Sequence, residues 1–332
     1  IDMNENINNG RGILLQTLYI FGNGFDIAHG IRTPYAAFRE FLKENHESFL
    51  TTFESMYNIR PLDDTEPWYT KEAQERWDKS VINDLWWSFE EKIGHPDVEG
   101  MYDSAYSMVD TMPMEGIIDT MNVYWREQYG FVDKLQKYVL EWLQTIDTSQ
   151  AMCKKDSLIN NRNDLFMSFN YTDTLEKVYG IKDVLHLHGG IPSCCEIAPI
   201  MGHGNKYIID LYRRKAKEAQ EEYVEWYESI CNAIADFCES LYKDTDAIIS
   251  ENDDFFSALW DVNQVVCLGM SFGDVDVPYL DRIEYEVRPE TKWLVYYHSD
   301  EDLKRLKSVF GITGISRKFE VYFRKSDNFW DR

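Results

Sequence analysis

The stretch that decides the fold runs from Leu18 to Tyr35 and reads LYIFGNGFDIAHGIRTPY. Strand-forming apolar residues lead directly into a Gly-Asn-Gly turn, and a helix-like pattern follows. Such a turn after a buried strand is typical of an anion site, where backbone amides and the next helix N-terminus receive a phosphate. However, Ile27 stands where a dinucleotide-binding fingerprint has its third glycine, and no Gly-Lys-Ser/Thr follows. The turn alone therefore leaves open a plain strand-to-helix connection.

The composition is that of a folded, acidic protein. Of 332 residues, 44% are hydrophobic and 28% are charged, enough for two domains or for one domain with large insertions. The formal net charge of -24 repels phosphate backbones and anionic headgroups, so we expect no binding to nucleic acid or to a membrane. The six cysteines show no C-x-x-C spacing, and no apolar run approaches the ~18 residues that span a bilayer, so we expect a cytoplasmic location.

Short apolar runs predict the strands of a sheet, and long stretches with helical periodicity lie between them. The predicted strands are Gln16–Phe21, Leu165–Phe169, Val184–His188, Gln264–Gly269, Trp293–Tyr297 and Phe319–Phe323. Alternation of this kind is typical of an α/β fold with an open, mostly parallel, Rossmann-like sheet. We expect a nucleotide-binding core from residues 13–35, 164–205 and 261–325. Residues 36–163 would form a helical insertion that serves as a lid, and residues 206–260 a second helical insertion.

Polar and glycine-rich segments follow four of the predicted strands. Besides the first turn, these are Asn170 and Tyr171 after one strand, His188 and Gly189 after the next, and the segment from Gly269 through Ser271 to Asp274. Ligands of parallel sheets bind outside the carboxyl ends of the strands, so these segments predict a single site.

Several of these residues have competing explanations. Asp26 is also placed to cap the following helix, and Asp274 and Asp276 either cap a helix or bind a ribose. A zinc site from His186, His188 and His203 lacks a fourth ligand, so no metal is expected.

Six segments of the chain, taken together, are similar to those of one family. FGNGFDIAHGIRTPYAAF, WWSFEE, SFNYTDTLEKVYG, HLHG, MGHGN and LGMSFGDVDVPYLDRI resemble the signature segments of the AbiH family of bacteriophage abortive infection proteins. A more distant resemblance is to the sirtuin-like NAD-consuming proteins, through GNGFD followed by HGIRTPY, through FNYT, through His188-Gly189, and through Gly269–Ser271. The chain departs from sirtuins at Thr172, where they carry Asp, and it has no four-cysteine zinc module.

The resemblance to sirtuins implies a site for NAD. In it, Gly22, Asn23, Gly24, Phe25 and Asp26 wrap the nucleotide, Asn170 lies near the nicotinamide ribose, and His188 is the general base. Ser271 and Gly269 contact the adenosine end. Tyr171, Gly189 and Asp274, taken from the segments after the strands, complete the predicted nucleotide-binding set.

Together these resemblances predict an anti-phage protein that hydrolyses NAD at the nicotinamide–ribose bond. Asn170 would orient water or the ribose, and Asp26 would stabilise the positive charge of the transition state. The alternative is a non-catalytic nucleotide-binding sensor that acts on a partner through its helical insertions. A homo-oligomer and a phage-derived trigger are both left open. The WWSFEE segment, Trp86–Glu91, is interpreted as helix core with a solvated face.

Overall fold

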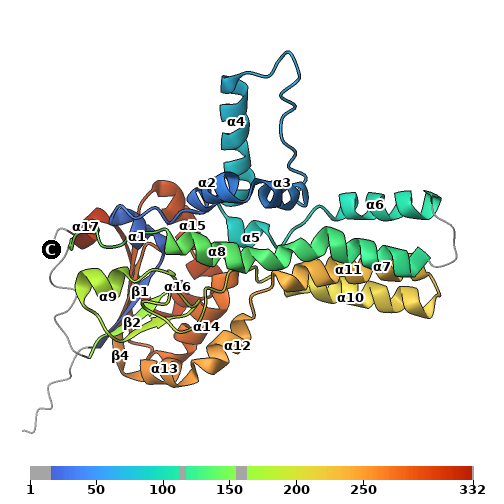
Figure 1. Cartoon of the computed structure of the whole chain (residues 1–332). Coiled ribbons are helices and arrows are strands. Elements are labelled where there is room, and N and C mark those ends of the chain that lie inside the picture. Colours follow the sequence, from blue (N-terminus) through green and yellow to red (C-terminus); the bar gives the residue numbers. More distant parts are fainter. Residues whose placement is uncertain (1–15, 112–116, 155–162, 331–332) are drawn as a thin grey trace, which may run out of the picture.

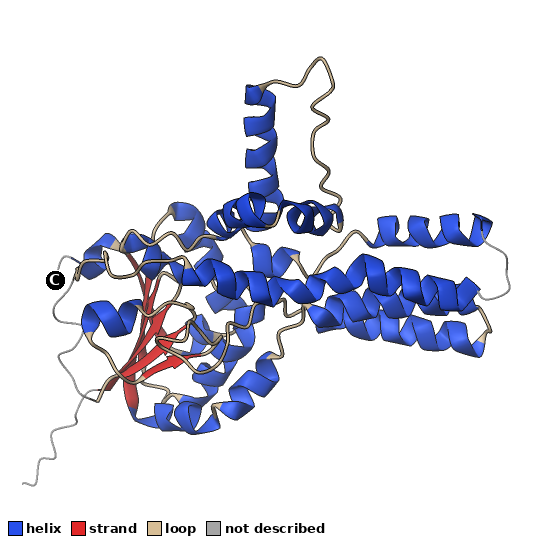
Figure 2. Cartoon of the chain, viewed as in Figure 1, coloured by secondary structure: helices blue, strands red, loops and turns tan. Residues whose placement is uncertain are grey.

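The computed structural model describes residues 16–111, 117–154 and 163–330. Residues 13–15 of the predicted core, and residues 112–116 and 155–162 of the predicted first insertion, lie outside the described residues. A parallel sheet lies at one end of the structure (Figures 1 and 2). It has six strands in the order β3-β2-β1-β4-β5-β6. Its strands are β1 (Gln16–Phe21), β2 (Leu165–Ser168), β3 (Val184–His186), β4 (Val262–Leu268), β5 (Lys292–Tyr297) and β6 (Glu320–Lys325).

The six strands confirm the predicted α/β fold with a parallel, Rossmann-like sheet. They coincide with the apolar runs because a strand buried on both faces by helices carries little polar sequence. The predicted third strand is shorter than expected, because it ends at His186, so His188 lies in the loop beyond it. The order of the strands reverses between β1 and β4, and this switch point is where doubly wound sheets hold their ligands.

Helices cover both faces of the sheet. One face packs on α12 (Thr245–Glu251), α14 and α15, and the other packs on α1, α9 and α17. Ile248, Tyr279 and Phe310 belong to the core of the first face. The helices of this part are α1 (Asn23–Ala28), α9 (Thr174–Tyr179), the 3₁₀ turn η5 (Asp274–Asp276), α14 (Val277–Glu286), α15 (Asp300–Ile312), α16 (Ile315–Lys318) and α17 (Asp327–Trp330).

The segments between the strands supply the remaining helices. Between β1 and β2 these are α2 (Tyr35–Asn45), α3 (Glu47–Ser55), α4 (Lys71–Val81), η1 (Ile82–Trp86), α5 (Phe89–Lys92), α6 (Val98–Thr111), α7 (Ile117–Tyr129), η2 (Gly130–Lys134) and α8 (Leu135–Gln144). Between β3 and β4 they are α10 (Lys206–Glu221), α11 (Glu225–Ser240), α12 (Thr245–Glu251), α13 (Asp253–Ser257) and η4 (Ala258–Asp261).

The two helical segments pack against each other rather than separately. Helices α6, α7, α10 and α11 form an elongated bundle that projects from the sheet, while α8 runs from the bundle back to it (Figure 1). A single apolar cluster joins them, with Trp142 from the first segment and Phe237 from the second. Amphipathic helices bury their apolar stripes against any matching surface, and here each segment supplies the other's core.

The turn after β1 lies against the turn after β4 with almost no space between them. A Cβ atom on Gly24 would lie 2.7 Å from the Cα of Gly269, and one on Gly22 would lie 2.6 Å from the Gly269 carbonyl oxygen. Gly269 itself has a φ of +72°, a conformation that suits glycine. The Gly22 amide donates to the Leu268 carbonyl at 3.0 Å, and the Gly24 amide to the Gly269 carbonyl at 2.9 Å.

These glycines therefore have a structural function. The sequence suggested that the amides of the turn would receive a phosphate, but the amides of Gly22 and Gly24 are occupied by the end of β4. These residues are glycine because two backbones meet here, at the point where the order of the strands in the sheet reverses.

Replacing Gly24 by alanine tests this contact. We expect Gly24→Ala to lower the free energy of unfolding by about 1–3 kcal/mol, since overpacking cannot be relieved when both neighbours are backbone. Gly130→Ala is the matched control, because a Cβ there meets nothing within 4 Å. It should leave stability unchanged or raise it by at most about 1 kcal/mol. Urea denaturation measures both, and equal effects of the two substitutions would contradict the contact.

Candidate functional site

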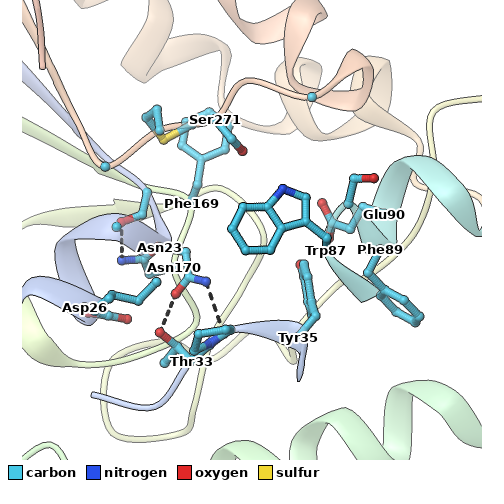
Figure 3. A pocket seen from close by; sticks show the side chains of 18 of the residues that line it. Asn23, Asp26, Thr33, Tyr35, Trp87, Phe89, Glu90, Phe169, Asn170 and Ser271 are labelled. Atoms are coloured by element: carbon cyan, nitrogen blue, oxygen red, sulfur yellow. Dashed lines mark hydrogen bonds between the residues drawn. The ribbon is translucent and has the colours of Figure 1, made fainter. Parts of the chain in front are cut away.

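A cavity of about 380 Å³ lies at the carboxyl ends of the central strands, within the range of about 300–1,000 Å³ that is usual for ligand sites (Figure 3). The turns after β1, β2 and β4 form one side, and the segment from η1 to α5 forms the other. It brings together most of the residues that the sequence singled out, namely Gly22, Asn23, Gly24, Asp26, Asn170, Tyr171, His188, Gly269 and Ser271.

Three predicted site residues, all in the described part of the chain, lie away from this cavity. Phe25 is buried beneath α1, where its ring packs against Phe21 and Tyr179. Gly189 turns the backbone with a φ of +67°, and a Cβ there would lie 2.2 Å from the Ala198 carbonyl oxygen. Asp274 is exposed, and the acidic residue of this loop that lines the cavity is Asp276.

Asp26 is a buried carboxyl group held by two threonines. Its side chain is 1% exposed and accepts hydrogen bonds from the hydroxyls of Thr172 at 2.6 Å and Thr174 at 2.7 Å. Burial raises the pKa of Asp26 to about 6, although these hydroxyls and Asn170 favour the charged form. The capping alternative is wrong, because Gly22 precedes α1 and Asp26 lies inside the helix. Thr172 is thus one of the residues that orient the carboxylate.

Asn170 connects the ends of β1 and β2. Its side-chain amide donates to the Gly22 carbonyl at 3.0 Å (Figure 3). The same group favours the charged form of the Asp26 carboxyl. The backbone carbonyl of Asn170 accepts a hydrogen bond from His186 Nδ1 at 3.1 Å. Asn170 therefore fixes both the glycine turn and the carboxylate beside it.

The opposite wall comes from the WWSFEE segment, which the sequence interpretation treated as helix core with a solvated face. Trp86 and Phe89 are indeed buried. Trp87, however, is 77% exposed, and its ring lies at the cavity beside Tyr35 (Figure 3). The π-helical turn η1 produces this orientation, since the Trp87 amide donates to the Ile82 carbonyl, five residues back, at 2.7 Å. Such turns are frequent at functional sites.

A buried ion pair adjoins the cavity. Lys243, which is 0% exposed, donates to Glu90 Oε1 at 2.8 Å, and the Tyr171 hydroxyl donates to the same oxygen at 3.1 Å. Lys243 Nζ also lies 3.4 Å from His188 Nδ1. Burial, together with the Lys243 charge, holds the pKa of His188 well below its usual value, so the imidazole is neutral at pH 7. Sequence reasoning missed both Glu90 and Lys243. Glu90 could have been found because it belongs to the WWSFEE segment, whereas no sequence signal indicated Lys243.

A second acidic group and an arginine complete the lining. Burial, followed by the nearby Glu90, raises the pKa of Asp276 to about 7, and the Gly273 amide donates to its carboxylate at 3.1 Å. Arg305 lines the cavity as well. A guanidinium group at such a position suits the binding of phosphate oxygens.

The described residues contain no group of three or more His, Cys, Asp or Glu side chains placed to hold a metal ion. Two of the three histidines of the zinc alternative have other partners. His186 contacts Glu176 at 2.7 Å through Nε2, and His203 contacts the Cys238 carbonyl at 3.0 Å.

Comparison with known families identifies the chain. The family model described as bacteriophage abortive infection AbiH matches residues 18–297, which include most of the sheet and both helical segments. The chain belongs to the AbiH family. No curated protein matches the chain in a sequence search. Among the helices of this AbiH protein that the structure describes, none has both the length and the apolar character needed to cross a bilayer.

The raised pKa of Asp26 gives the AbiH protein a pH-dependent stability. The unfolded state releases this proton near pH 3.9, whereas the folded state keeps it up to about pH 6, so rising pH favours unfolding over this window. Asp26→Asn removes the effect and still bonds both threonines. We expect the variant to gain about 3 kcal/mol relative to the wild type between pH 3.5 and pH 7. Denaturant titrations at several pH values measure this, and parallel profiles would contradict the burial of a titrating group.

Proposed function

We propose that this abortive infection protein binds NAD in the cavity and hydrolyses the nicotinamide–ribose bond. One observation carries the proposal: the cavity lies at the switch point of a 3-2-1-4-5-6 parallel sheet, with a buried carboxyl group, Asp26, in its wall. That position is where dinucleotides bind in sheets of this order. The resemblance to sirtuin-like proteins adds the choice of NAD.

The chemistry suits the surroundings of Asp26. Cleavage of the bond to nicotinamide builds positive charge on the ribose, and a fixed carboxylate stabilises that charge more in the transition state than in the ground state. With a pKa of about 6, Asp26 is mainly ionised at pH 7 and remains able to accept a proton from attacking water. Asn170 contributes by holding the carboxylate and the glycine turn in place.

Other parts of the lining fit the remaining groups of a dinucleotide. Trp87 and Tyr35 offer aromatic faces on which a base can stack. Arg305 offers a guanidinium group to the pyrophosphate. It takes the place of the glycine amides, which already donate to carbonyl groups at the end of β4. The predicted contacts of Ser271 and Gly269 with the adenosine end belong to this proposal. It assigns the acceptance of the proton to Asp26, in place of the general base that the sequence analysis expected at His188.

The alternative, a nucleotide sensor without turnover, is favoured by a different observation. Glu90 and Lys243 come from the two helical segments and meet beside the cavity. A ligand that contacts this pair can therefore change the packing of the helical bundle, which is the surface a partner would meet.

Release of nicotinamide decides between the two. The protein is incubated with NAD, beside Asp26→Asn and the control Gly130→Ala. We expect release by the wild type and the control, and a loss of at least about 100-fold in Asp26→Asn, as is usual when such a group is removed. Because Asp26→Asn is expected to be more stable than the wild type, unfolding would not explain its loss.

Calorimetry with NAD completes this experiment. Saturable binding to the wild type without release would favour the sensor. Neither binding nor release would contradict both uses of NAD.

A further inference from the structure

The two ring nitrogens of His188 have different surroundings. Nδ1 faces Lys243 Nζ at 3.4 Å. Nε2 is buried and has no hydrogen-bond partner among the described residues. His188 is 3% exposed and is one of the residues that line the cavity. An unpaired polar atom in such a place carries a desolvation penalty of about 1–3 kcal/mol unless a ligand or a water satisfies it.

The position of Lys243 decides which nitrogen carries the proton. An ammonium group has three donors and no acceptor, so a favourable contact with Nδ1 requires a lone pair on Nδ1. A neutral imidazole has one N–H, and it must then be on Nε2. The charged form, with two N–H groups, would place an imidazolium beside an ammonium group. Burial and the Lys243 charge both disfavour that form, and they lower the pKa of His188.

The place of Lys243 is itself fixed. Glu90 Oε1 accepts from its ammonium group at 2.8 Å, and its backbone amide donates to the His203 carbonyl at 2.9 Å. A buried ion pair rarely adds to stability when compared with apolar residues of the same size. The charged groups near His188 are Lys243, its partner Glu90, and Asp276, whose carboxyl group interacts with both. The uncharged ring of Tyr279 packs beside His188, with 5.5 Å between the ring centroids.

We propose that Lys243 is a positioning residue that fixes His188 as the Nε2–H tautomer, so that the cavity presents a hydrogen-bond donor to an oxygen of the ligand. The proposal rests on the cavity being the ligand site, as proposed above, but the tautomer does not depend on the ligand being NAD. The ligand atom that meets Nε2 is an acceptor: a carbonyl, hydroxyl or phosphate oxygen. His188 is then not the general base, and Asp26 is left as the proton acceptor.

Nitrogen-15 NMR of the histidine rings tests the tautomer directly in the full chain. Long-range correlations separate Nδ1–H, Nε2–H and imidazolium forms, and His188→Gln identifies the signal by its loss. We expect the neutral Nε2–H form from pH 5.5 to pH 8. The Lys243→Met/Glu90→Gln double variant removes both charges together, so that neither is left buried without its partner. We expect it to populate the Nδ1–H tautomer or to titrate within this range.

A wild-type signal of the Nδ1–H type, or one that titrates near pH 6.5, would overturn the proposal whatever the ligand. So would an unchanged Nε2–H signal in the double variant.

Binding supplies a second measurement. The amide nitrogen of glutamine takes the place of Nε2–H, whereas leucine keeps the bulk and has no donor. We expect His188→Gln to retain NAD affinity within about threefold and His188→Leu to lose about 10- to 100-fold, the range expected for one hydrogen bond. Equal affinity in the two variants would mean that Nε2 meets only a buried water, and would overturn the donor role. Absence of NAD binding in the wild type would contradict the proposed function alone, because the NMR result stands without it.

Discussion

The contact between the turn after β1 and the turn after β4 is the constraint on which the rest depends. Gly24 and Gly269 touch through their backbones, and this close approach joins the two halves of the sheet at its switch point. Side chains on neighbouring turns are thereby directed toward one volume. The cavity exists because the strands on either side of this junction turn their loops in opposite directions.

Charge inside the cavity is arranged by the helical segments as well as by the sheet. Asp26 and Asn170 are held by the core, whereas Glu90 and Lys243 arrive from the two segments between strands. A fully buried lysine needs its partner to be present, since an unpaired charge in such surroundings is strongly destabilising. Glu90 and Lys243 lie 153 residues apart in the chain, so the two segments cannot change independently at this point. The segments are part of the site and not additions to it.

The sequence predicted the sheet well, and it named several residues that line one cavity. Apolar runs specify buried strands locally, so all six were found. The strand-end rule led to Asn170, His188 and Ser271, which all line the cavity. Lys243 was missed because its burial arises from packing between distant helices, which no local pattern records. Asp276 rather than Asp274 faces inward because the 3₁₀ turn η5 orients the two side chains differently. The glycines were recognised, but their partner backbone lies more than 240 residues away in the chain.

The π-helical turn Ile82–Trp86 has a consequence for the length of the chain. Such a turn holds one residue more than an α-helical turn, and each residue of an α-helix advances the rotation by about 100°. Loss of a single residue here would restore regular winding and rotate α4 relative to α5. Trp87 and Glu90 could then no longer both reach the cavity while Trp86 keeps its bond to Glu54. This wall of the cavity is therefore sensitive to deletions, even of one residue, to a degree that its exposed position does not suggest.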